Sequence, residues 1–198
     1  MFSNSLRALL YSEILNYLKD SYCCIVLKAD DIANELKEPD QECFSPVVEL
    51  LGSTVLDNFG KINNQRMAEI LFSDSKKRKQ IEMIIHPAVK KQIQMQIKME
   101  REKGGMDFLF VEAALLIEDH YDEILDELWY VYADETVRRN RLKKSRGYSD
   151  DKISTIFSEQ LTENEFRKSC RVTIDNSNDI HNTFSQIDHI LGEYLCQN

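Results

Sequence analysis

Acidic residues follow each of four short apolar runs along this chain. The runs cover residues 23–27, 108–111, 128–132 and 172–174, and the acidic residues that follow them are Asp30, Asp31, Glu112, Asp134 and Asp175. A carboxylate in such a place can accept a proton from a hydroxyl group or help to order the shell of a magnesium ion. Helix capping is the competing interpretation, because Asp30 or Asp31 could cap a helix that begins near Ile32. The positions alone leave both interpretations open.

Six basic residues crowd one short stretch of an otherwise acidic chain. They are Arg138, Arg139, Arg141, Lys143, Lys144 and Arg146. Helical spacing places Arg138 and Arg141 on one face, where arginine side chains can neutralise the oxygens of a polyphosphate. The alternative is a solvated helix face whose charge is balanced by Glu135, Asp150 and Asp151. The stretch therefore predicts either a phosphate clamp or a charged surface helix.

The elements that position these residues are predicted from the pattern of apolar residues. The four runs are rich in residues that favour β-strands and are too short for helices, so we expect buried strands with both faces covered. Helices are predicted over residues 13–19, 67–71, 76–85, 136–144, 150–161 and 179–194, and Pro87 is expected to begin a further one that ends at Gly104. Strands that alternate with helices predict an α/β fold with a three-layer parallel sheet and helices on both faces. Ligands of such sheets bind at the carboxyl ends of the strands, which is where the acidic residues lie.

Composition excludes several classes of protein. The 198 residues carry a formal net charge of -9, which argues against nucleic acid or a membrane surface as a partner. No apolar run approaches the roughly 20 residues of a membrane-spanning helix, and the start of the chain lacks the long apolar region of a signal peptide. The five cysteines have neither disulfide nor zinc spacing, so we expect buried thiols in the reducing cytoplasm.

Several segments of the chain, in their order, resemble those of one enzyme family. They are residues 26–36 with Glu38 and Pro39, residues 60–63 with Arg66, the triplet 85–87, residues 111–118, the arginine-rich stretch 138–146 and residues 173–177. From about Ser12 onward, the ordered set resembles the dephospho-CoA kinases. The resemblance implies a P-loop kinase fold related to the nucleoside monophosphate kinases, formed as one domain over residues 1–198. Within it, residues 31–86 would be a helical region that binds the acceptor substrate, and residues 138–150 would be a lid.

Members of this family transfer the γ-phosphoryl group of ATP to the 3′-hydroxyl group of dephospho-CoA, the last step of coenzyme A synthesis. The resemblance therefore implies a kinase that uses ATP, dephospho-CoA and Mg2+ in the cytoplasm. Asp30 matches the family's base, which accepts the proton of the hydroxyl group, and Lys28 replaces an acidic residue that the family often has two positions earlier. His86, Glu112 and Leu115 match the pocket of the acceptor substrate, although His86 by itself would be interpreted as a capping or packing residue.

The remaining matches concern ATP. Arg141 matches a lid arginine that closes over the phosphates. A second lid arginine is expected where this chain has Ser145, and Arg146 follows one residue later. Asn176 matches the contact with the adenine end of ATP. In one register, Ser12 matches the Ser/Thr of the phosphate-binding loop, which contacts ATP and the metal ion.

The chain departs from the family before Ser12. The family has a β-strand, the loop G-x-x-x-x-G-K-[ST] and then a helix, whereas here Tyr11 stands at the place of the lysine and no glycine precedes Gly52. Glycines let backbone N–H groups wrap the phosphates, and the lysine reaches the β- and γ-oxygens. We therefore predict that this chain binds ATP poorly and transfers little phosphate.

Two explanations of this departure are open. A frame error or a misplaced start has replaced the strand and the loop, or the chain is a true relative that has lost the loop together with its kinase activity. The competing functions are a catalytically inactive relative that binds CoA or dephospho-CoA, and a P-loop phosphotransferase that acts on a different nucleotide.

Overall fold

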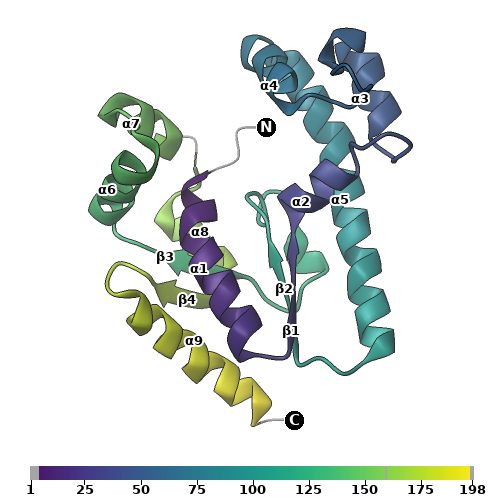
Figure 1. Ribbon diagram of the computed structural model, residues 1–198. Helices are drawn as coiled ribbons and strands as arrows, with labels where there is room; N and C mark the ends of the chain where they lie inside the picture. Colours follow the sequence, from purple (N-terminus) through teal and green to yellow (C-terminus); the bar gives the residue numbers. More distant parts are fainter. Residues whose placement is uncertain (1–4, 159, 197–198) are drawn as a thin grey trace. The chain divides into compact units, whose positions relative to one another are not determined.

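The computed structural model describes residues 5–158 and 160–196, which fall into two compact units (Figure 1). One unit comprises residues 22–114, and the other comprises residues 5–21 together with the described residues from 115 onward. Each unit holds one pair of parallel β-strands with helices packed beside them. The candidate site residues are divided between the units: Asp30, His86 and Glu112 belong to the first, and Ser12, Leu115, Arg141, Arg146 and Asn176 belong to the second.

In the first unit, strands β1 and β2 pair along their whole lengths. β1 (Cys24–Lys28) lies parallel to β2 (Phe108–Glu112), and Lys28 is opposite Glu112 at the carboxyl ends of the strands. The residues between them form α2 (Ala29–Glu35), α3 (Phe44–Leu51), the short 3-10 helix η1 (Ser53–Val55), α4 (Asn64–Ser73) and α5 (Ser75–Lys103). The stretch between the strands is therefore mostly helical, as its sequence predicted.

In the second unit, β3 (Trp129–Tyr132) and β4 (Val172–Asp175) form the other parallel pair. The helices of this unit are α1 (Ser5–Ser21), the 3-10 helix η2 (Tyr121–Glu123), α6 (Glu135–Arg146), α7 (Asp150–Ser158), α8 (Glu163–Ser169) and α9 (Ile180–Leu195). Tyr17 of α1 stacks on Phe184 of α9 with ring centroids 3.9 Å apart, and its hydroxyl group donates to Asp188 at 2.5 Å. Helix α9 packs in turn against β4, so these contacts anchor α1 within the unit.

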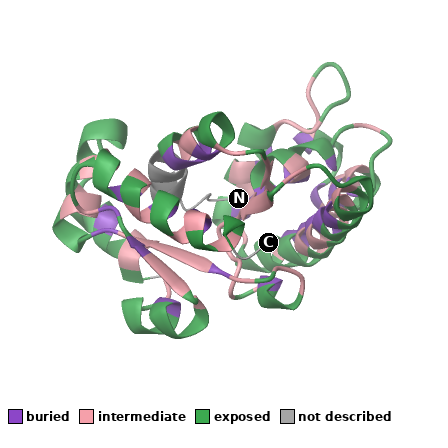
Figure 2. Ribbon diagram, turned by 90° about the horizontal axis from the view of Figure 1, so that it is seen from below, coloured by how far each residue is buried: buried purple, intermediate pink, exposed green. Residues whose placement is uncertain are grey.

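The strands confirm the predicted α/β class and the parallel pairing, but within the described residues they do not form one continuous sheet. There β1 pairs with β2 and β3 pairs with β4, and no described strand joins the two pairs. The described residues before β1 form helix α1, from Ser5 to Ser21, rather than a further strand. Most strand residues are half buried, and the buried residues lie mainly on the helices (Figure 2). Each strand of such a two-stranded ribbon is paired along one edge only within the described residues.

Helix α5 corrects the prediction that Pro87 begins a new helix. It runs without interruption from Ser75 to Lys103, with Pro87 inside it. A proline in a helix interior removes one backbone hydrogen bond and costs about 3 kcal/mol. The buried residues of α5 form one stripe that continues on both sides of the proline: Ile81, Ile85, Ala88, Val89, Ile93 and Ile97. Burial of each large aliphatic side chain contributes roughly 1.5–3 kcal/mol, so the stripe outweighs the loss at the proline.

Helix α8 was not predicted from the sequence, and α7 ends at Ser158, earlier than predicted. A capping box begins α8: the N–H of Glu165 donates to the Thr162 hydroxyl oxygen at 3.3 Å, and the N–H of Thr162 donates to the Glu165 carboxylate at 2.7 Å. The pattern Thr-x-x-Glu is therefore a sequence signal that could have predicted this helix.

Two predictions about the class of protein can be compared with the structure. None of the described helices is long and apolar enough to cross a membrane. The five cysteines all lie among the described residues and have free thiols, but only Cys43 is buried. The prediction of buried thiols was therefore wrong for the other four, which are partly or fully exposed.

Candidate functional site

Asp30 lies in the first turn of α2, directly after the carboxyl end of β1. The helix begins at Ala29, its N-cap residue is Lys28, and no side chain makes a capping hydrogen bond. The interpretation that Asp30 or Asp31 caps this helix is therefore wrong, because both residues lie inside it. The helix dipole favours a carboxylate in the first turn, and Asp30 is exposed, so a ligand can reach it.

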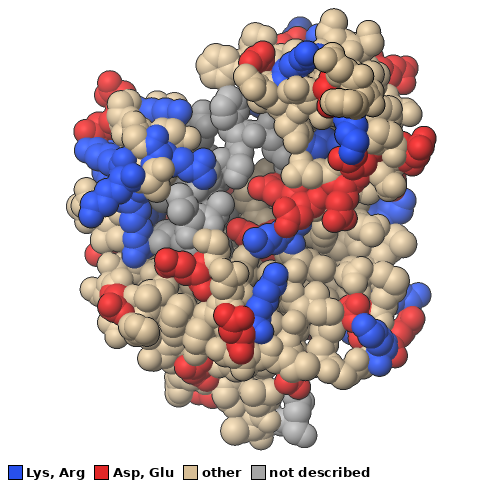
Figure 3. All heavy atoms as spheres, viewed as in Figure 1, with Lys and Arg blue, Asp and Glu red and all other residues tan. Residues whose placement is uncertain are grey.

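Glu112 lies at the same end of the strand pair, on the neighbouring strand. Burial raises the pKa of Glu112, the opposite Lys28 lowers it, and the negative charges of Asp30 and Asp31 raise it further. Lys28, Asp30 and Asp31 therefore lie within electrostatic reach of Glu112 at the carboxyl ends of β1 and β2. Figure 3 shows acidic side chains gathered over α2. Within this unit, the sequence correctly predicted that acidic residues collect at the strand ends.

The raised pKa of Glu112 predicts a pH-dependent gain in stability for the variant Glu112→Gln. A carboxyl group whose pKa is raised on folding favours the folded state below its ordinary value of 4.5, and it loses this contribution as the pH rises through the raised pKa. Glutamine stays neutral at every pH. We expect equal melting temperatures below about pH 4 and a melting temperature about 2 °C higher for the variant at pH 8.

Thermal melts followed by circular dichroism from pH 4 to pH 8 measure this difference. Glu118→Gln removes a charge from an exposed position and serves as the control, with no expected change in melting temperature across the range. A Glu112→Gln variant that is less stable at pH 8 than at pH 4, relative to the parent chain, would contradict the prediction.

Lys37 is a charged residue of this unit that sequence reasoning missed. It is buried, and its Nζ donates to Oδ1 of Asn64, the first residue of α4, at 2.8 Å. Its spacing of seven residues from Asp30, about two helical turns, was the signal that could have drawn attention to it.

His86 does not lie at a helix start, as its position before Pro87 suggested, whereas Leu115 lies in the segment after β2. His86 lies half buried in the interior of α5, so it does not cap a helix, and packing is the interpretation that remains beside substrate binding. Leu115 is half buried just after β2, and its carbonyl oxygen accepts from the N–H of Asp119 at 2.9 Å. The roles of both residues, and of Glu112, in binding an acceptor substrate stay predictions.

In the second unit, two of the residues predicted to bind ATP are in direct contact. A guanidinium N–H of Arg141 donates to the backbone oxygen of Asn176 at 3.0 Å. Asn176 is fully buried, and its side-chain Nδ2 has no hydrogen-bond partner among the described residues. Burial lowers the pKa of Arg141, and the charge of Glu13 on α1 raises it. The half-buried guanidinium group of Arg141 is therefore bonded to the backbone of Asn176, while the side-chain amide of Asn176 keeps an N–H donor without a partner among the described residues.

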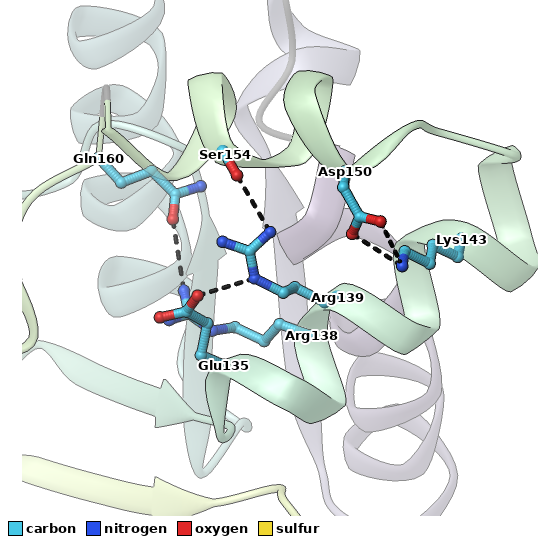
Figure 4. Close-up of polar contacts among 7 residues, drawn as sticks. All are labelled: Glu135, Arg138, Arg139, Lys143, Asp150, Ser154 and Gln160. Atoms are coloured by element: carbon cyan, nitrogen blue, oxygen red, sulfur yellow. Dashed lines mark hydrogen bonds and ion pairs between the residues drawn. The ribbon is translucent and has the colours of Figure 1, made fainter.

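The other basic residues of the stretch divide into two groups, and the first group joins α6 to α7. Figure 4 shows the contacts: Arg139 donates to Glu135 at 2.7 Å and to Ser154 at 3.2 Å, Lys143 pairs with Asp150 at 2.7 Å, and Arg138 donates to Gln160 at 3.5 Å. The guanidinium groups of Arg138 and Arg139 also lie 4.6 and 5.0 Å from the centre of the Phe157 ring. For Arg139 and Lys143, the interpretation as a balanced surface helix describes the structure. Arg138 has no acidic partner among the described residues, and its Nε is buried there without a hydrogen bond.

Lys144 and Arg146 form the second group. Both are exposed in the last turn of α6, and no residue in the described part of the chain pairs with either side chain. Figure 3 shows Lys and Arg side chains gathered over α6 and α7. Of the two arginines predicted to bind phosphate, Arg141 is therefore fixed by its hydrogen bond to Asn176, whereas no described residue neutralises the charge of Arg146.

Ser12 lies half buried in the interior of α1, well after the first residue of that helix. Backbone N–H groups in a helix interior are used by the helix, whereas phosphate-binding loops offer N–H groups at a helix N-terminus. The part of the chain that the structure describes holds no cluster of three acidic, histidine or cysteine residues that could bind a metal by itself. A magnesium ion bound through the phosphates of ATP needs only one or two protein ligands, so the residues present are compatible with it. The predicted role of Ser12 toward ATP and the metal stays a prediction.

Comparison with known proteins identifies relatives along most of the chain. The family model for dephospho-CoA kinase matches residues 11–182. The dephospho-CoA kinase of Carboxydothermus hydrogenoformans is 31% identical over 169 residues, which cover 85% of this chain and 82% of that protein. The dephospho-CoA kinase of Oceanobacillus iheyensis is 28% identical over 169 residues, which cover 85% of this chain and 84% of the relative.

Solved structures share the fold. The crystal structure of TT1252 from Thermus thermophilus superposes with a TM-score of 0.72 at 20% identity, covering 96% of this chain and 93% of the other. The dephospho-CoA kinase from Campylobacter jejuni superposes with a TM-score of 0.66 at 19% identity, covering 93% of this chain and 89% of the other.

Proposed function

Because the chain belongs to the dephospho-CoA kinase family, we propose that it binds dephospho-CoA with the 3′-hydroxyl group of the nucleotide against Asp30. The observation that carries the proposal is the exposed Asp30 in the first turn of α2, at the carboxyl end of β1 and within the electrostatic reach of Glu112. The helices between residues 31 and 86 would hold the remainder of the acceptor substrate, together with His86, Glu112 and Leu115.

In the reaction of the family, each charged group would have one task. The Asp30 carboxylate accepts the proton of the 3′-hydroxyl group while the oxygen of that hydroxyl group attacks the γ-phosphorus of ATP. The bond between the γ-phosphorus and the bridging oxygen breaks, and ADP leaves with its electron pair. Arg141 and Arg146 neutralise the charge that builds up on the phosphoryl oxygens, and residues 138–150 would act as a lid that excludes water. Asn176 would contact the adenine end of ATP. A magnesium ion bound with ATP would be held by the phosphates and by Ser12, and it would supply positive charge that neutralises the charge developing on the phosphoryl oxygens.

The binding of ATP, the phosphoryl donor, is the part of this reaction for which the 198-residue chain is poorly equipped. Its sequence has no glycine before Gly52 and no lysine before Lys19, so no segment before Ser12 can form the loop that wraps the phosphates of ATP. We therefore propose that the chain binds dephospho-CoA well, binds ATP poorly and transfers phosphate slowly. The five free thiols support the cytoplasm as its compartment.

Isothermal titration calorimetry with the purified chain tests the proposal. We expect saturable binding of dephospho-CoA, weak or undetectable binding of ATP, and about tenfold weaker binding of dephospho-CoA by Asp30→Asn, because a hydrogen bond to a carboxylate is lost. Asp31→Asn is the matched control, since it removes the same charge from the neighbouring exposed residue. We expect it to bind dephospho-CoA like the parent chain.

Other outcomes would favour other functions. Binding of dephospho-CoA without any turnover would agree with an inactive CoA-binding relative, which is the second candidate. Tight binding of ATP, together with turnover that Asp30→Asn abolishes, would contradict the proposal that the chain binds ATP poorly and transfers phosphate slowly. Turnover with another nucleotide as acceptor, in place of dephospho-CoA, would contradict the assignment of the substrate.

A further inference from the structure

Asn176, the residue directly after β4, is fully buried, and all but one of its polar groups are bonded. Its N–H donates to the carbonyl oxygen of Tyr132 at 2.7 Å, and its own carbonyl oxygen accepts from Arg141 at 3.0 Å. Its side-chain Oδ1 accepts at 3.2 Å from the hydroxyl group of Thr183, a fully buried residue of α9. Only the side-chain Nδ2 has no partner among the described residues. A buried donor without a partner costs free energy, so it points to a ligand that would accept from it.

The neighbours of Thr183 determine which acceptor takes its hydroxyl proton. Its Oγ1 lies 3.2 Å from Oδ1 of Asn176 and 3.2 Å from the carbonyl oxygen of Asp175. That carbonyl oxygen already accepts from Nε2 of Gln186 at 2.9 Å, and the Asp175 N–H donates to Oε1 of Gln186 at 2.9 Å. A threonine hydroxyl group has a single proton to donate. Because Gln186 satisfies both backbone groups of Asp175, that proton is available for Oδ1 of Asn176.

The hydroxyl group of Thr183 therefore sets the orientation of the Asn176 amide. An amide side chain carries an acceptor oxygen and a donor nitrogen, and turning it by half a revolution exchanges the two. With Oδ1 bonded to α9, the group that remains for a ligand is the donor Nδ2. In adenine, ring nitrogens accept hydrogen bonds, whereas the exocyclic amino group donates them. A fixed Nδ2 can therefore pair with a ring nitrogen but not with the amino group.

We propose that Thr183 is a positioning residue for Asn176: its hydroxyl group fixes the side-chain amide so that Nδ2 donates to a ring nitrogen of adenine. This inference rests on the proposed function, in which Asn176 contacts the adenine end of ATP. In the chain without a ligand Asn176 is fully buried, so the base reaches Nδ2 once the side chains that cover it move aside. The new hydrogen bond then removes the cost of the unpaired donor.

Nuclear magnetic resonance of the Asn176 side chain in the 198-residue chain, without a ligand, tests the coupling directly. The 15N–1H signals of Nδ2 are assigned from the backbone signals of the same residue and are measured in the parent chain, in Thr183→Val and in Thr183→Ser. Valine keeps the shape of threonine without its hydroxyl group, and serine keeps the hydroxyl group. We expect Thr183→Val to shift the signals and Thr183→Ser to leave them near their positions in the parent chain. Equal shifts in both variants, or a shift in neither, would overturn the proposal.

Titration of the same three proteins with ATP tests whether the fixed amide serves the base. Because we expect poor binding of ATP, Kd is measured by nuclear magnetic resonance up to about 10 mM ATP. Thr183→Val should raise the Kd for ATP about three- to tenfold, and Thr183→Ser should keep it within about twofold. Inorganic tripolyphosphate, which has no base, is the control ligand, and its Kd should be the same in all three proteins. An unchanged Kd for ATP in Thr183→Val, or equal losses with ATP and tripolyphosphate, would overturn the proposal.

The parent chain alone tests which atom of the base is contacted, so this measurement does not depend on the folding of a variant. It uses three analogues of ATP, each with one acceptor nitrogen of the adenine ring replaced by C–H. We expect ATP to shift the Nδ2 signals of Asn176, and one of the analogues to bind without shifting them. Shifts of the same size with all three analogues, or no shift with ATP at about 10 mM, would overturn the proposal.

These measurements separate the inference from the proposed function. If the parent chain does not bind dephospho-CoA, the proposed function fails, while the ligand-free signals of Asn176 still measure its coupling to Thr183. If dephospho-CoA binds and ATP leaves the Asn176 signals in place, the proposed binding of the acceptor substrate stands and the role of Thr183 is refuted.

Discussion

Joining a β-strand and the loop G-x-x-x-x-G-K directly to Ser12, in place of residues 1–11, is expected to raise the rate of phosphoryl transfer at least about a thousandfold. In the present chain, residues 9–12 lie inside α1, so their backbone N–H groups belong to a helix. The exchange begins that helix at Ser12, frees N–H groups for the β- and γ-phosphates and supplies the lysine that neutralises them. The helix remains anchored, because the stacking of Tyr17 on Phe184 lies beyond the exchanged segment.

Transfer of the γ-phosphoryl group from ATP to dephospho-CoA, followed by separation of the nucleotides, measures the effect. The control is the same exchanged chain with alanine in place of the loop lysine, which should lose most of the gained rate while it keeps its affinity for dephospho-CoA. An exchanged chain that binds ATP tightly and still transfers no faster than the 198-residue chain would contradict the account, because the acceptor half would then be at fault.

In the exchanged chain, Arg141→Ala is expected to lower kcat about a hundred- to a thousandfold with little change in the KM for dephospho-CoA. Arg141 is half buried and donates to the carbonyl oxygen of Asn176. Unlike Arg139 and Lys143, it makes no hydrogen bond or ion pair with a described residue of α7. Its remaining N–H groups can therefore neutralise phosphoryl oxygens, and water screens this interaction less at a half-buried side chain than at an exposed one.

Lys144→Ala is the matched control for this prediction. It removes the same charge from the same helix, but its side chain is exposed, and solvent and salt screen its interactions. We expect a change in kcat of about threefold or less. Circular dichroism of both variants checks that α6 still folds. Equal losses in the two variants would show that the basic stretch acts only through its summed charge, and would contradict the specific role of Arg141.

The strands and the position of Asp30 could be predicted from the sequence because both depend on local pattern. Short runs of β-favouring residues predicted β1 to β4 within one or two residues, and the acidic residues after them collect at the strand ends of the first unit. The sequence also separated Arg141 and Arg146 from their basic neighbours, but only through the resemblance to a family. Helical periodicity alone did not distinguish them from Arg139, whose partners Glu135 and Ser154 become visible only in the folded chain.

Other features depend on tertiary packing, which local pattern does not report. Pro87 was expected to begin a helix, but a stripe of buried residues on both sides of it holds α5 together. The sequence does not single out Lys37, because a charged residue is ordinarily solvated, and only the folded chain buries it and brings its Nζ to Asn64. The division of the strands into two pairs could not be predicted either, because strand pairing is a long-range property that each strand's own sequence leaves open.

The contact between Asp30 and the acceptor hydroxyl group is tested most directly by the 13C carboxylate signal of Asp30 in the 198-residue chain. The signal is assigned with Asp30→Asn and followed during titration with dephospho-CoA and with its 3′-deoxy analogue, which lacks only the hydroxyl group. The account predicts that dephospho-CoA shifts the Asp30 signal, that the 3′-deoxy analogue binds without shifting it, and that the signal of Asp31 stays in place with both. Identical shifts of Asp30 with the two ligands would contradict the account.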